Sequence, residues 1–215
     1  MKFDAVIFDM DGTLLDTIED LTDSVNHAMT VCGHEAHSIE RVKDFVGNGA
    51  RRLIEQALGG NADTELIEQG LSAFKTHYNA HGTKTRPYTG ILELLHELKD
   101  LGIKTAVVSN KFHAAVVPTS EKHFGSLMDI AIGESSEIRR KPAPDTVLKA
   151  MNDLGVSKER CVYIGDSEVD IATAKNAGIP CISVTWGYRE ESYLREVGGN
   201  IFAHSTDELR TYLLG

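Results

Sequence analysis

The sequence of 215 residues is long enough for one substantial hydrophobic core, or for a core domain with a smaller insertion. No apolar stretch approaches the roughly 20 residues that span a bilayer, which argues against a membrane protein. The formal net charge of -10 argues against non-specific binding of nucleic acid, which requires a basic surface. An anionic substrate would therefore need a metal ion or a local group of basic side chains.

Short runs rich in valine and isoleucine recur along the chain and predict strands. The first covers residues 5–8, and later runs cover residues 104–110, 127–133, 161–166, 180–186 and, more weakly, 200–204. Segments with the apolar spacing of a helix lie between them, and Gly155 and Gly178 follow two of these segments as helix-ending residues. Strands that alternate with helices predict an α/β, doubly wound fold, in which helices cover both faces of a parallel sheet.

Residues 14–86 break this alternation, because they contain no convincing strand and at least three helical patterns. The apolar positions of these patterns are Ile18, Leu21, Val25, Ala28 and Met29; Ile39, Val42, Phe45 and Val46; and Leu66, Ile67, Phe74 and Tyr78. We therefore expect residues 14–86 to be a helical domain inserted into a core domain made of residues 1–13 and 87–215.

Polar residues that directly follow the predicted strands are the candidates for a functional site, because ligands of doubly wound sheets bind beyond the carboxyl ends of the strands. They are Asp9 and Asp11, Ser109 and Asn110, and Asp166, Ser167 and Asp170, with Lys141 in a loop before a predicted helix. The expected site thus combines up to four carboxylates with a hydroxyl, an amide and one ammonium group.

Such a group of carboxylates is difficult to keep ionised without a cation. Magnesium prefers oxygen ligands and keeps several waters, so that Asp9, Asp166 and one backbone carbonyl between Asp9 and Asp11 would be enough protein ligands. One aspartate of the first pair could then be a nucleophile and metal ligand, while the other transfers a proton. The site is therefore expected to use Mg²⁺ as its cofactor.

Four motifs in this order resemble those of the haloacid dehalogenase (HAD) superfamily of phosphatases. They are "DMDGT" (9–13), "VVSNK" (107–111), "RRKPAPD" (139–145) and "GDSEVD" (165–170). The resemblance covers the whole chain and implies a Rossmann-like HAD core with an inserted helical cap domain at residues 14–86. It also implies a phosphatase that acts on a small phosphorylated metabolite. The N-terminus lacks the basic start and apolar segment of a secretory signal, so we expect the protein in the cytoplasm. We expect no nucleic-acid or membrane partner, and a monomer or weak homodimer.

The resemblance implies catalytic roles for four residues. Asp9 would attack phosphorus and form an aspartyl-phosphate, and Asp11 would protonate the leaving oxygen and then deprotonate the hydrolytic water. Ser109 would donate a hydrogen bond to the transferring phosphoryl group, and Lys141 would offset its charge.

The remaining assignments concern the metal ion and the phosphate. Asp166 would bind Mg²⁺ together with Asp9 and the backbone carbonyl of Asp11, and Asp170 would be a weaker ligand or lie behind the ligands. Gly12 would let backbone amides approach the phosphate, and Asn110 is a further candidate for phosphate binding. Asp170 could alternatively only cap its helix.

The inserted domain is expected to determine substrate specificity by closing over the site. The segment "VGNGARRL" (46–53) has the composition of a loop that could reach an anion, which makes Asn48 and Arg51 candidates for substrate binding; Arg52 is a further candidate, and a solvated helix start is the alternative reading. This segment, with "RPYTGI" (86–91) and "VTWGY" (184–188), resembles the phosphoglycolate phosphatase branch of the superfamily. The implied substrate is 2-phosphoglycolate.

Other functions stay open at this point. Pyrophosphatases and sugar phosphomutases share much of the pattern, and phospho-receiver or phosphate-binding modules also combine acidic residues, a hydroxyl group and a lysine. A calcium loop is disfavoured, because the sixth residue from Asp9 is Leu14 and not the glycine of an EF-hand.

Two histidines, His77 and His81, stand four residues apart on a helical pattern and could share a metal ion. Because no third ligand lies near them in sequence, we expect them to be polar surface residues of the insertion. The three cysteines, at 32, 161 and 181, have no CxxC spacing, so that neither a disulfide framework nor a thiolate zinc site is expected.

Overall fold

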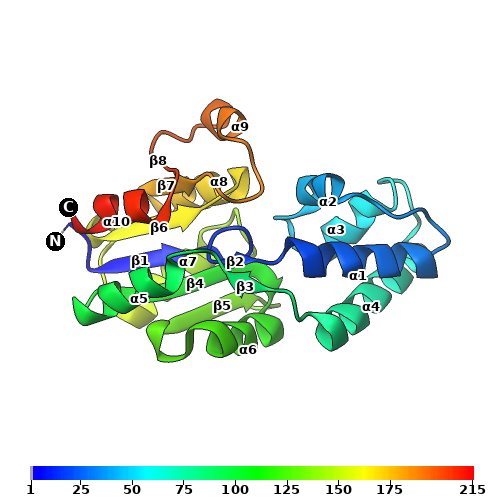
Figure 1. The fold of residues 1–215 in the computed structure, drawn as a ribbon, viewed down its shortest axis with the longest axis horizontal. Coiled ribbons are helices and arrows are strands. Elements are labelled where there is room, and N and C mark those ends of the chain that lie inside the picture. The colour runs from blue at the N-terminus through cyan, green and yellow to red at the C-terminus, as the bar shows by residue number, and fades with distance from the viewer. Residues whose placement is uncertain (1) are drawn as a thin grey trace. The chain divides into compact units, whose positions relative to one another are not determined.

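A computed structural model describes residues 2–215, and the chain forms two compact units. The first unit contains the chain up to Leu15 together with Pro87–Gly215, and the second unit is Asp16–Arg86. The chain passes from one unit to the other at two places, in the strands β2 (Leu15–Asp16) and β3 (Arg86–Pro87). These two strands form a two-stranded sheet. Figure 1 shows the arrangement of the elements within each unit.

The first unit alternates strands and helices. Its elements are β1 (Ala5–Phe8), α5 (Ile91–Asp100), β4 (Lys104–Phe112), α6 (His113–Phe124), the 3-10 turn Gly125–Leu127, β5 (Ile130–Glu134), α7 (Asp145–Leu154), the 3-10 turn Lys158–Arg160, β6 (Cys161–Gly165), α8 (Glu168–Ala177), β7 (Cys181–Val184), α9 (Glu191–Glu196), β8 (Phe202–Ala203) and α10 (Thr206–Leu214).

The strands of the first unit form one parallel sheet in the order β5-β4-β1-β6-β7-β8. This confirms the predicted α/β, doubly wound class. The chain builds the sheet outwards from β1 in one direction through β4 and β5, and then returns to the other side of β1 with β6. The end of β1 is therefore the point where the strand order reverses, which is where sheets of this kind bind ligands.

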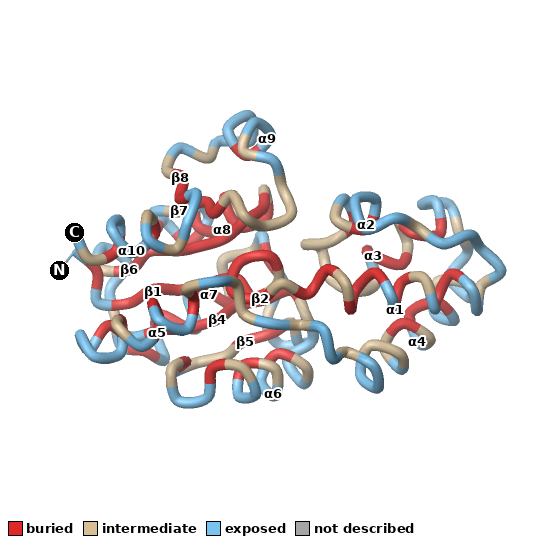
Figure 2. The backbone as a smooth tube through the Cα atoms, viewed as in Figure 1, coloured by how far each residue is buried: buried red, intermediate tan, exposed pale blue. Residues whose placement is uncertain are grey.

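Most residues of the strands in this unit are buried, as Figure 2 shows. Along β1, Val6 and Phe8 belong to one apolar cluster, and Ala5 and Ile7 belong to another; none of the four is accessible to solvent. Because side chains of a strand point alternately to the two faces, a strand covered on both sides reads as a continuous apolar run.

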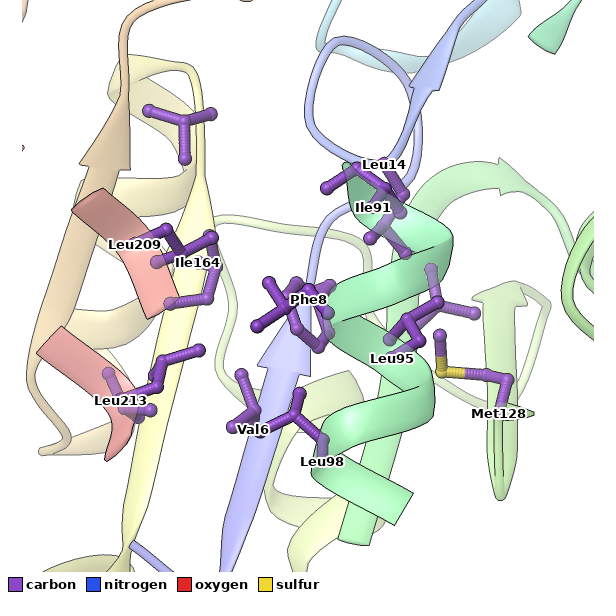
Figure 3. Close-up of a cluster of buried hydrophobic side chains, with 14 of the residues drawn as sticks. Val6, Phe8, Leu14, Ile91, Leu95, Leu98, Met128, Ile164, Leu209 and Leu213 are labelled. Carbon is purple, nitrogen blue, oxygen red and sulfur yellow. The ribbon is translucent and has the colours of Figure 1, made fainter. Parts of the chain in front are cut away.

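Helices α5 and α10 contribute to the cluster that contains Val6 and Phe8, and Figure 3 shows these side chains meeting between β1, β6 and the two helices. Helices α7 and α8 contribute Val147, Met151 and Ala174 to the cluster on the opposite face. This burial fixes β1 between two helical layers, so that the residues directly after β1 have a defined position.

The second unit contains four helices: α1 (Ile18–Val31), α2 (Ile39–Phe45), α3 (Gly49–Ala57) and α4 (Thr64–His81). Both structures considered for the segment 46–53 occur: residues 46–48 lie between two helices, and α3 begins at Gly49 directly after Asn48. The carboxylate of Asp20 in α1 accepts hydrogen bonds from the backbone N–H groups of Lys84 and Thr85 and from the Thr85 hydroxyl. This buried carboxylate ties the start of the unit to its end.

No helix within residues 2–215 is both long enough and apolar enough to cross a membrane.

Truncating Leu95 to alanine tests the packing that holds β1. Leu95 of α5 is fully buried, so Leu95→Ala should lower the free energy of unfolding by about 2–5 kcal/mol, measured by urea denaturation. Leu92 on the same helix is 37% exposed, and Leu92→Ala should change it by less than about 0.5 kcal/mol. Equal effects of the two variants would contradict the described core.

Candidate active site

Four segments of the first unit bring the predicted polar residues to the carboxyl ends of neighbouring strands. Asp9 directly follows β1, and Asp166 directly follows β6, its parallel neighbour. Ser109 lies in β4, on the other side of β1, where the pairing with β5 becomes irregular after Val108. Lys141 lies in the loop between β5 and α7.

The ammonium group of Lys141 is the centre of a buried network. Its Nζ lies 2.7 Å from Oδ1 of Asp9 and 2.8 Å from Oδ1 of Asp170, and it donates a hydrogen bond of 3.1 Å to the hydroxyl oxygen of Tyr163. The Tyr163 hydroxyl in turn donates to Oδ1 of Asp170 at 2.9 Å. Lys141 is 2% exposed and Asp170 is fully buried. A buried charge requires such partners, because isolation from water is otherwise too costly.

The backbone of Lys141 is fixed by Asn110. The side-chain amide of Asn110 donates to the carbonyl of Lys141 at 3.0 Å, and its Oδ1 accepts from the N–H of Lys141 at 2.7 Å. The side chain of Asn110 thus contacts the loop that carries Lys141, and its predicted contact with phosphate stays a prediction. The reciprocal pair sets the position from which the lysine enters the site.

The carboxylate of Asp166 is held by two donors and surrounded by two glycines. Its Oδ1 accepts from the hydroxyl of Thr13 at 3.0 Å, and its Oδ2 accepts from the backbone N–H of Tyr188 at 2.8 Å. A Cβ atom added to Gly12 would lie 2.4 Å from Oδ2 of Asp166, and one added to Gly187 would lie 2.3 Å from its Cβ. No side chain fits at either position, so both glycines are needed for the carboxylate to occupy its site.

Asp170 combines two tasks at the start of α8. Its Oδ2 accepts from the backbone N–H and the hydroxyl of Ser167, at 3.1 and 2.6 Å, in a capping box. Its Oδ1 accepts from Lys141 and Tyr163. Each oxygen therefore receives two protein donors, so that Asp170 is both a helix cap and the partner of the lysine.

Three carboxyl groups share the single ammonium group in this buried site, and this raises the pKa values of two of them. Burial, followed by the charge of Asp170, raises the pKa of Asp9 well above its ordinary value, against the opposing effect of Lys141. Burial and Asp170 also raise the pKa of Asp166 from 3.8 to about 7. Burial alone would lower the pKa of Lys141, but the charges of Asp170 and Asp9 outweigh it and raise that pKa. The lysine therefore stays charged, and another cation would favour ionisation of the carboxyl groups.

The donor set fits such a cation. Asp9, Asp166 and Asp170 each offer an oxygen atom, and the three atoms lie within 4.8 Å of one another. Carboxylate oxygens are hard ligands of the kind that Mg²⁺ prefers. Asp170 already has two donors on each oxygen, which leaves Asp9 and Asp166 as the side chains best able to bind a cation.

The second aspartate of the first motif has a partner that sequence analysis missed. Nζ of Lys111 lies 3.2 Å from Oδ1 of Asp11, and both side chains are largely buried. Ser109 is also buried, and its Oγ accepts a hydrogen bond of 3.1 Å from the backbone N–H of Lys111. Lys111 belongs to the "VVSNK" motif, so this residue could have been identified from the sequence.

Tyr163 and Gly187 were missed for different reasons. Tyr163 stands in the apolar run of β6, where only its hydroxyl group signals that a buried aromatic ring requires a polar partner. The role of Gly187 depends on the close approach of Asp166, which no local pattern reveals. In the same turn, Trp186 donates from Nε1 to the backbone carbonyl of Thr13 at 3.1 Å, which connects "VTWGY" to the first motif.

The predicted substrate residues Asn48 and Arg51 belong to the second unit. Asn48 immediately precedes α3, and the guanidinium of Arg51 forms ion pairs with Glu68 and with Glu55. Arg52 pairs with Glu55 as well. Their contact with a substrate stays a prediction.

A doubly wound parallel sheet with buried carboxylates, one buried lysine and a helical insertion after the first strand defines the class of hydrolases to which the motifs point. The family profile of haloacid dehalogenase-like hydrolases matches residues 6–184. The chain belongs to this family.

Several proteins that are similar in sequence or structure carry names that indicate an activity. A phosphoglycolate phosphatase of Pseudomonas putida is 32% identical over 98% of this chain and 78% of its own length. A phosphoglycolate phosphatase of Agrobacterium fabrum is 37% identical over 86% of this chain and 81% of its own length. A crystal structure from Lactobacillus delbrueckii subsp. bulgaricus, provisionally named a phosphoglycolate phosphatase, is 38% identical and covers both chains completely with a TM-score of 0.96. The protein is therefore a phosphomonoester hydrolase, and a small phosphorylated compound is its substrate.

The buried carboxylates predict how stability depends on pH and on Mg²⁺. Because the folded chain keeps the proton of Asp166 up to about pH 7 and the unfolded chain releases it near 3.8, the free energy of unfolding should fall as the pH rises between these values. If Mg²⁺ binds the ionised carboxylates, it should raise the melting temperature by several degrees, and more near pH 8 than near pH 6.

Asp166→Asn provides the control for this measurement, because it removes the charge and keeps the shape. The variant should show a weaker pH dependence and little response to Mg²⁺ in differential scanning fluorimetry. A melting temperature that rises equally with Mg²⁺ at both pH values, or in the variant as in the wild type, would show that the carboxylates are not the cause.

Proposed function

We propose that the protein is a magnesium-dependent phosphatase that hydrolyses 2-phosphoglycolate through an aspartyl-phosphate at Asp9. The observation that carries the proposal is the placement of Lys141 between Asp9 and Asp170 at the reversal of the strand order. Phosphoryl transfer requires mainly positioning and stabilisation of charge, and this arrangement supplies a nucleophile beside a fixed ammonium group.

The first half-reaction transfers the phosphoryl group to the protein. A carboxylate oxygen of Asp9 forms a bond to phosphorus while the bond between phosphorus and the ester oxygen breaks. Asp11 gives its proton to the leaving oxygen. The ammonium of Lys111, 3.2 Å from Asp11, stabilises the carboxylate that this transfer leaves. The alcohol product then leaves, and the phosphoryl group stays on Asp9.

The second half-reaction restores Asp9. Asp11, now a carboxylate, takes a proton from a water molecule, whose oxygen bonds to phosphorus while the bond between phosphorus and Asp9 breaks. Inorganic phosphate is released. Ser109 donates a hydrogen bond to the phosphoryl oxygens, the ammonium of Lys141 offsets their charge, and Gly12 lets backbone amides approach them.

Mg²⁺ would be held by Asp9, Asp166 and the backbone carbonyl of Asp11, and when bound it would neutralise the carboxylates and the charge on the phosphoryl group. In this proposal Asp170 orients Lys141 and is not a direct ligand, because both of its oxygens already accept two hydrogen bonds. Asn110 contributes by fixing the backbone of Lys141.

Asp9→Asn tests the nucleophile. The substitution should lower kcat at least about a thousandfold, because it removes the negative charge of the attacking oxygen and preserves the shape of the side chain. Steady-state release of phosphate measures the loss, and mass spectrometry after rapid acid quenching should detect a phosphorylated wild-type chain but not a phosphorylated variant. Asp153→Asn, which changes an exposed carboxylate in α7, should retain full activity. Turnover of Asp9→Asn near the wild-type rate would contradict the mechanism.

A panel of phosphate esters tests whether 2-phosphoglycolate is the preferred substrate and whether Arg51 recognises it. Phosphate release from 2-phosphoglycolate should be faster than from phosphomonoesters without a carboxylate and than from pyrophosphate, and it should need no bisphosphate activator. We expect Arg51→Ala to lower kcat/KM for 2-phosphoglycolate about tenfold or more and to affect uncharged esters little, because a guanidinium recognises a carboxylate by paired hydrogen bonds.

Arg41→Ala is the control, because it removes an exposed guanidinium of the same unit that pairs with Asp44 and is not among the predicted substrate residues. Equal losses across the panel for Arg51→Ala would show that the residue does not select the substrate. Faster turnover of pyrophosphate, or transfer of the phosphoryl group to a sugar hydroxyl, would favour the pyrophosphatase or the phosphomutase alternative.

A further inference from the structure

A second lysine of the first unit stands beside Asp11. Asp11 lies between β1 and β2, and Lys111 lies near the carboxyl end of β4, the strand that pairs with β1 in parallel (Figure 1). Nζ of Lys111 donates a hydrogen bond of 3.2 Å to Oδ1 of Asp11. Because both residues belong to the unit that contains Asp9, the place of this ion pair in the site is set by the core domain alone.

The backbone of Lys111 is held in the irregular part of β4. Its N–H donates a hydrogen bond of 3.1 Å to Oγ of Ser109. The register between β4 and β5 shifts between Val108 and Phe112. Gly133 of β5 approaches this stretch so closely that an added Cβ atom would lie 2.6 Å from the carbonyl oxygen of Lys111. The lysine is therefore attached to a backbone that contacts fix on two sides.

The two lysines of the site differ in how far solvent reaches them. The side chain of Lys141 is 2% exposed, and two carboxyl groups and a tyrosine hydroxyl contact its ammonium. The side chains of Lys111 and Asp11 are 12% and 15% exposed. A molecule that enters from solvent can therefore contact the pair of Lys111 and Asp11, whereas only the end of the molecule that enters furthest can approach Lys141.

The proposed mechanism restricts where the alcohol part of the ester lies. Asp11 gives its proton to the ester oxygen, so that oxygen must come within about 2.6–3.2 Å of the carboxyl group. In 2-phosphoglycolate one CH₂ group separates the ester oxygen from the carboxylate, and ordinary bond lengths place a carboxylate oxygen about 3 Å from the ester oxygen. Nζ of Lys111 is 3.2 Å from Asp11. The substrate carboxylate can thus reach this ammonium while the ester oxygen contacts Asp11.

We propose that Lys111 binds the carboxylate of 2-phosphoglycolate and thereby selects esters that carry a carboxylate on the carbon next to the ester oxygen. This inference rests on the proposed function of the site. An ammonium group can donate up to three hydrogen bonds, so a bond to the substrate is compatible with the bond to Asp11. A hydrogen bond between an ammonium and a carboxylate is stronger than a neutral one, and it is screened less where little water is present.

The charge of the site gives a reason for this second cation. 2-Phosphoglycolate has two anionic groups, and the ammonium of Lys141 already lies between Asp9 and Asp170. A substrate carboxylate beside Asp11 would bring two acidic groups together, and an ammonium in contact with both offsets their charge. Arg51, the predicted residue of the second unit, can bind the same carboxylate in addition, because a carboxylate has two accepting oxygens.

Two esters of the same shape separate recognition of the carboxylate from general catalysis. They are 2-phosphoglycolate and phosphoglycolamide, in which a neutral amide replaces the carboxylate. Lys111→Gln should lower kcat/KM for 2-phosphoglycolate at least about tenfold more than for the amide, measured by phosphate release in excess Mg²⁺. The additional loss should lie mainly in KM, because the contact exists before and during the reaction. The loss shared by both esters measures the effect of Lys111 on Asp11.

Further variants control for charge and for folding. Lys111→Met, a second neutral variant that keeps an unbranched apolar stem, should show the same change in preference between the esters. Lys111→Arg keeps the charge and should retain more of the preference than either neutral variant. Lys122→Gln removes the same charge from an exposed residue of α6 and should leave the preference unchanged. Circular dichroism and turnover of phosphoglycolamide verify that each variant is folded.

Equal losses on the two esters in Lys111→Gln and Lys111→Met would show that the lysine acts only on Asp11, and would overturn the inference while the proposed function stands. A change of preference in Lys122→Gln as large as in Lys111→Gln would reveal a long-range effect of net charge and would also overturn it. A wild type with equal kcat/KM for both esters would overturn the inference together with 2-phosphoglycolate as the preferred substrate. The preference of the wild type therefore distinguishes the two failures.

Discussion

The candidate active site depends on one buried ammonium group. Lys141 meets Asp9, Asp170 and the hydroxyl of Tyr163 within 3.1 Å, in a place that water hardly reaches. A charge in such a place is stable only with close partners of opposite sign, and removing either side would leave the other unpaired. The lysine thus holds together the end of β1, the middle of β6 and the start of α8. Because carboxyl groups still outnumber the ammonium group, the same arrangement that fixes Asp9 also favours the binding of a cation.

The main chain does as much as the side chains to build this arrangement. Asn110 holds the backbone of Lys141 from both sides, and the backbone N–H of Tyr188 holds the carboxylate of Asp166. Gly12 and Gly187 leave the space that this carboxylate occupies. A chemical group positioned in this way cannot relax easily, since the contacts come from different segments of the chain. Preorganisation of charge of this kind is what phosphoryl transfer asks of a protein.

Sequence patterns predicted the fold class and the positions of the strands well, because a parallel sheet covered on both faces produces continuous apolar runs such as residues 5–8. The four motifs pointed to the residues that the structure gathers around Lys141. What they could not predict is the direction of individual side chains: Asn110 faces a loop backbone, and Tyr163 reaches the lysine from the middle of an apolar strand. The start of α3 at Gly49 was left open because two glycines and an asparagine suit a loop as well as a helix start. Contacts over long sequence separations, such as Gly187 with Asp166, carry no local signal at all.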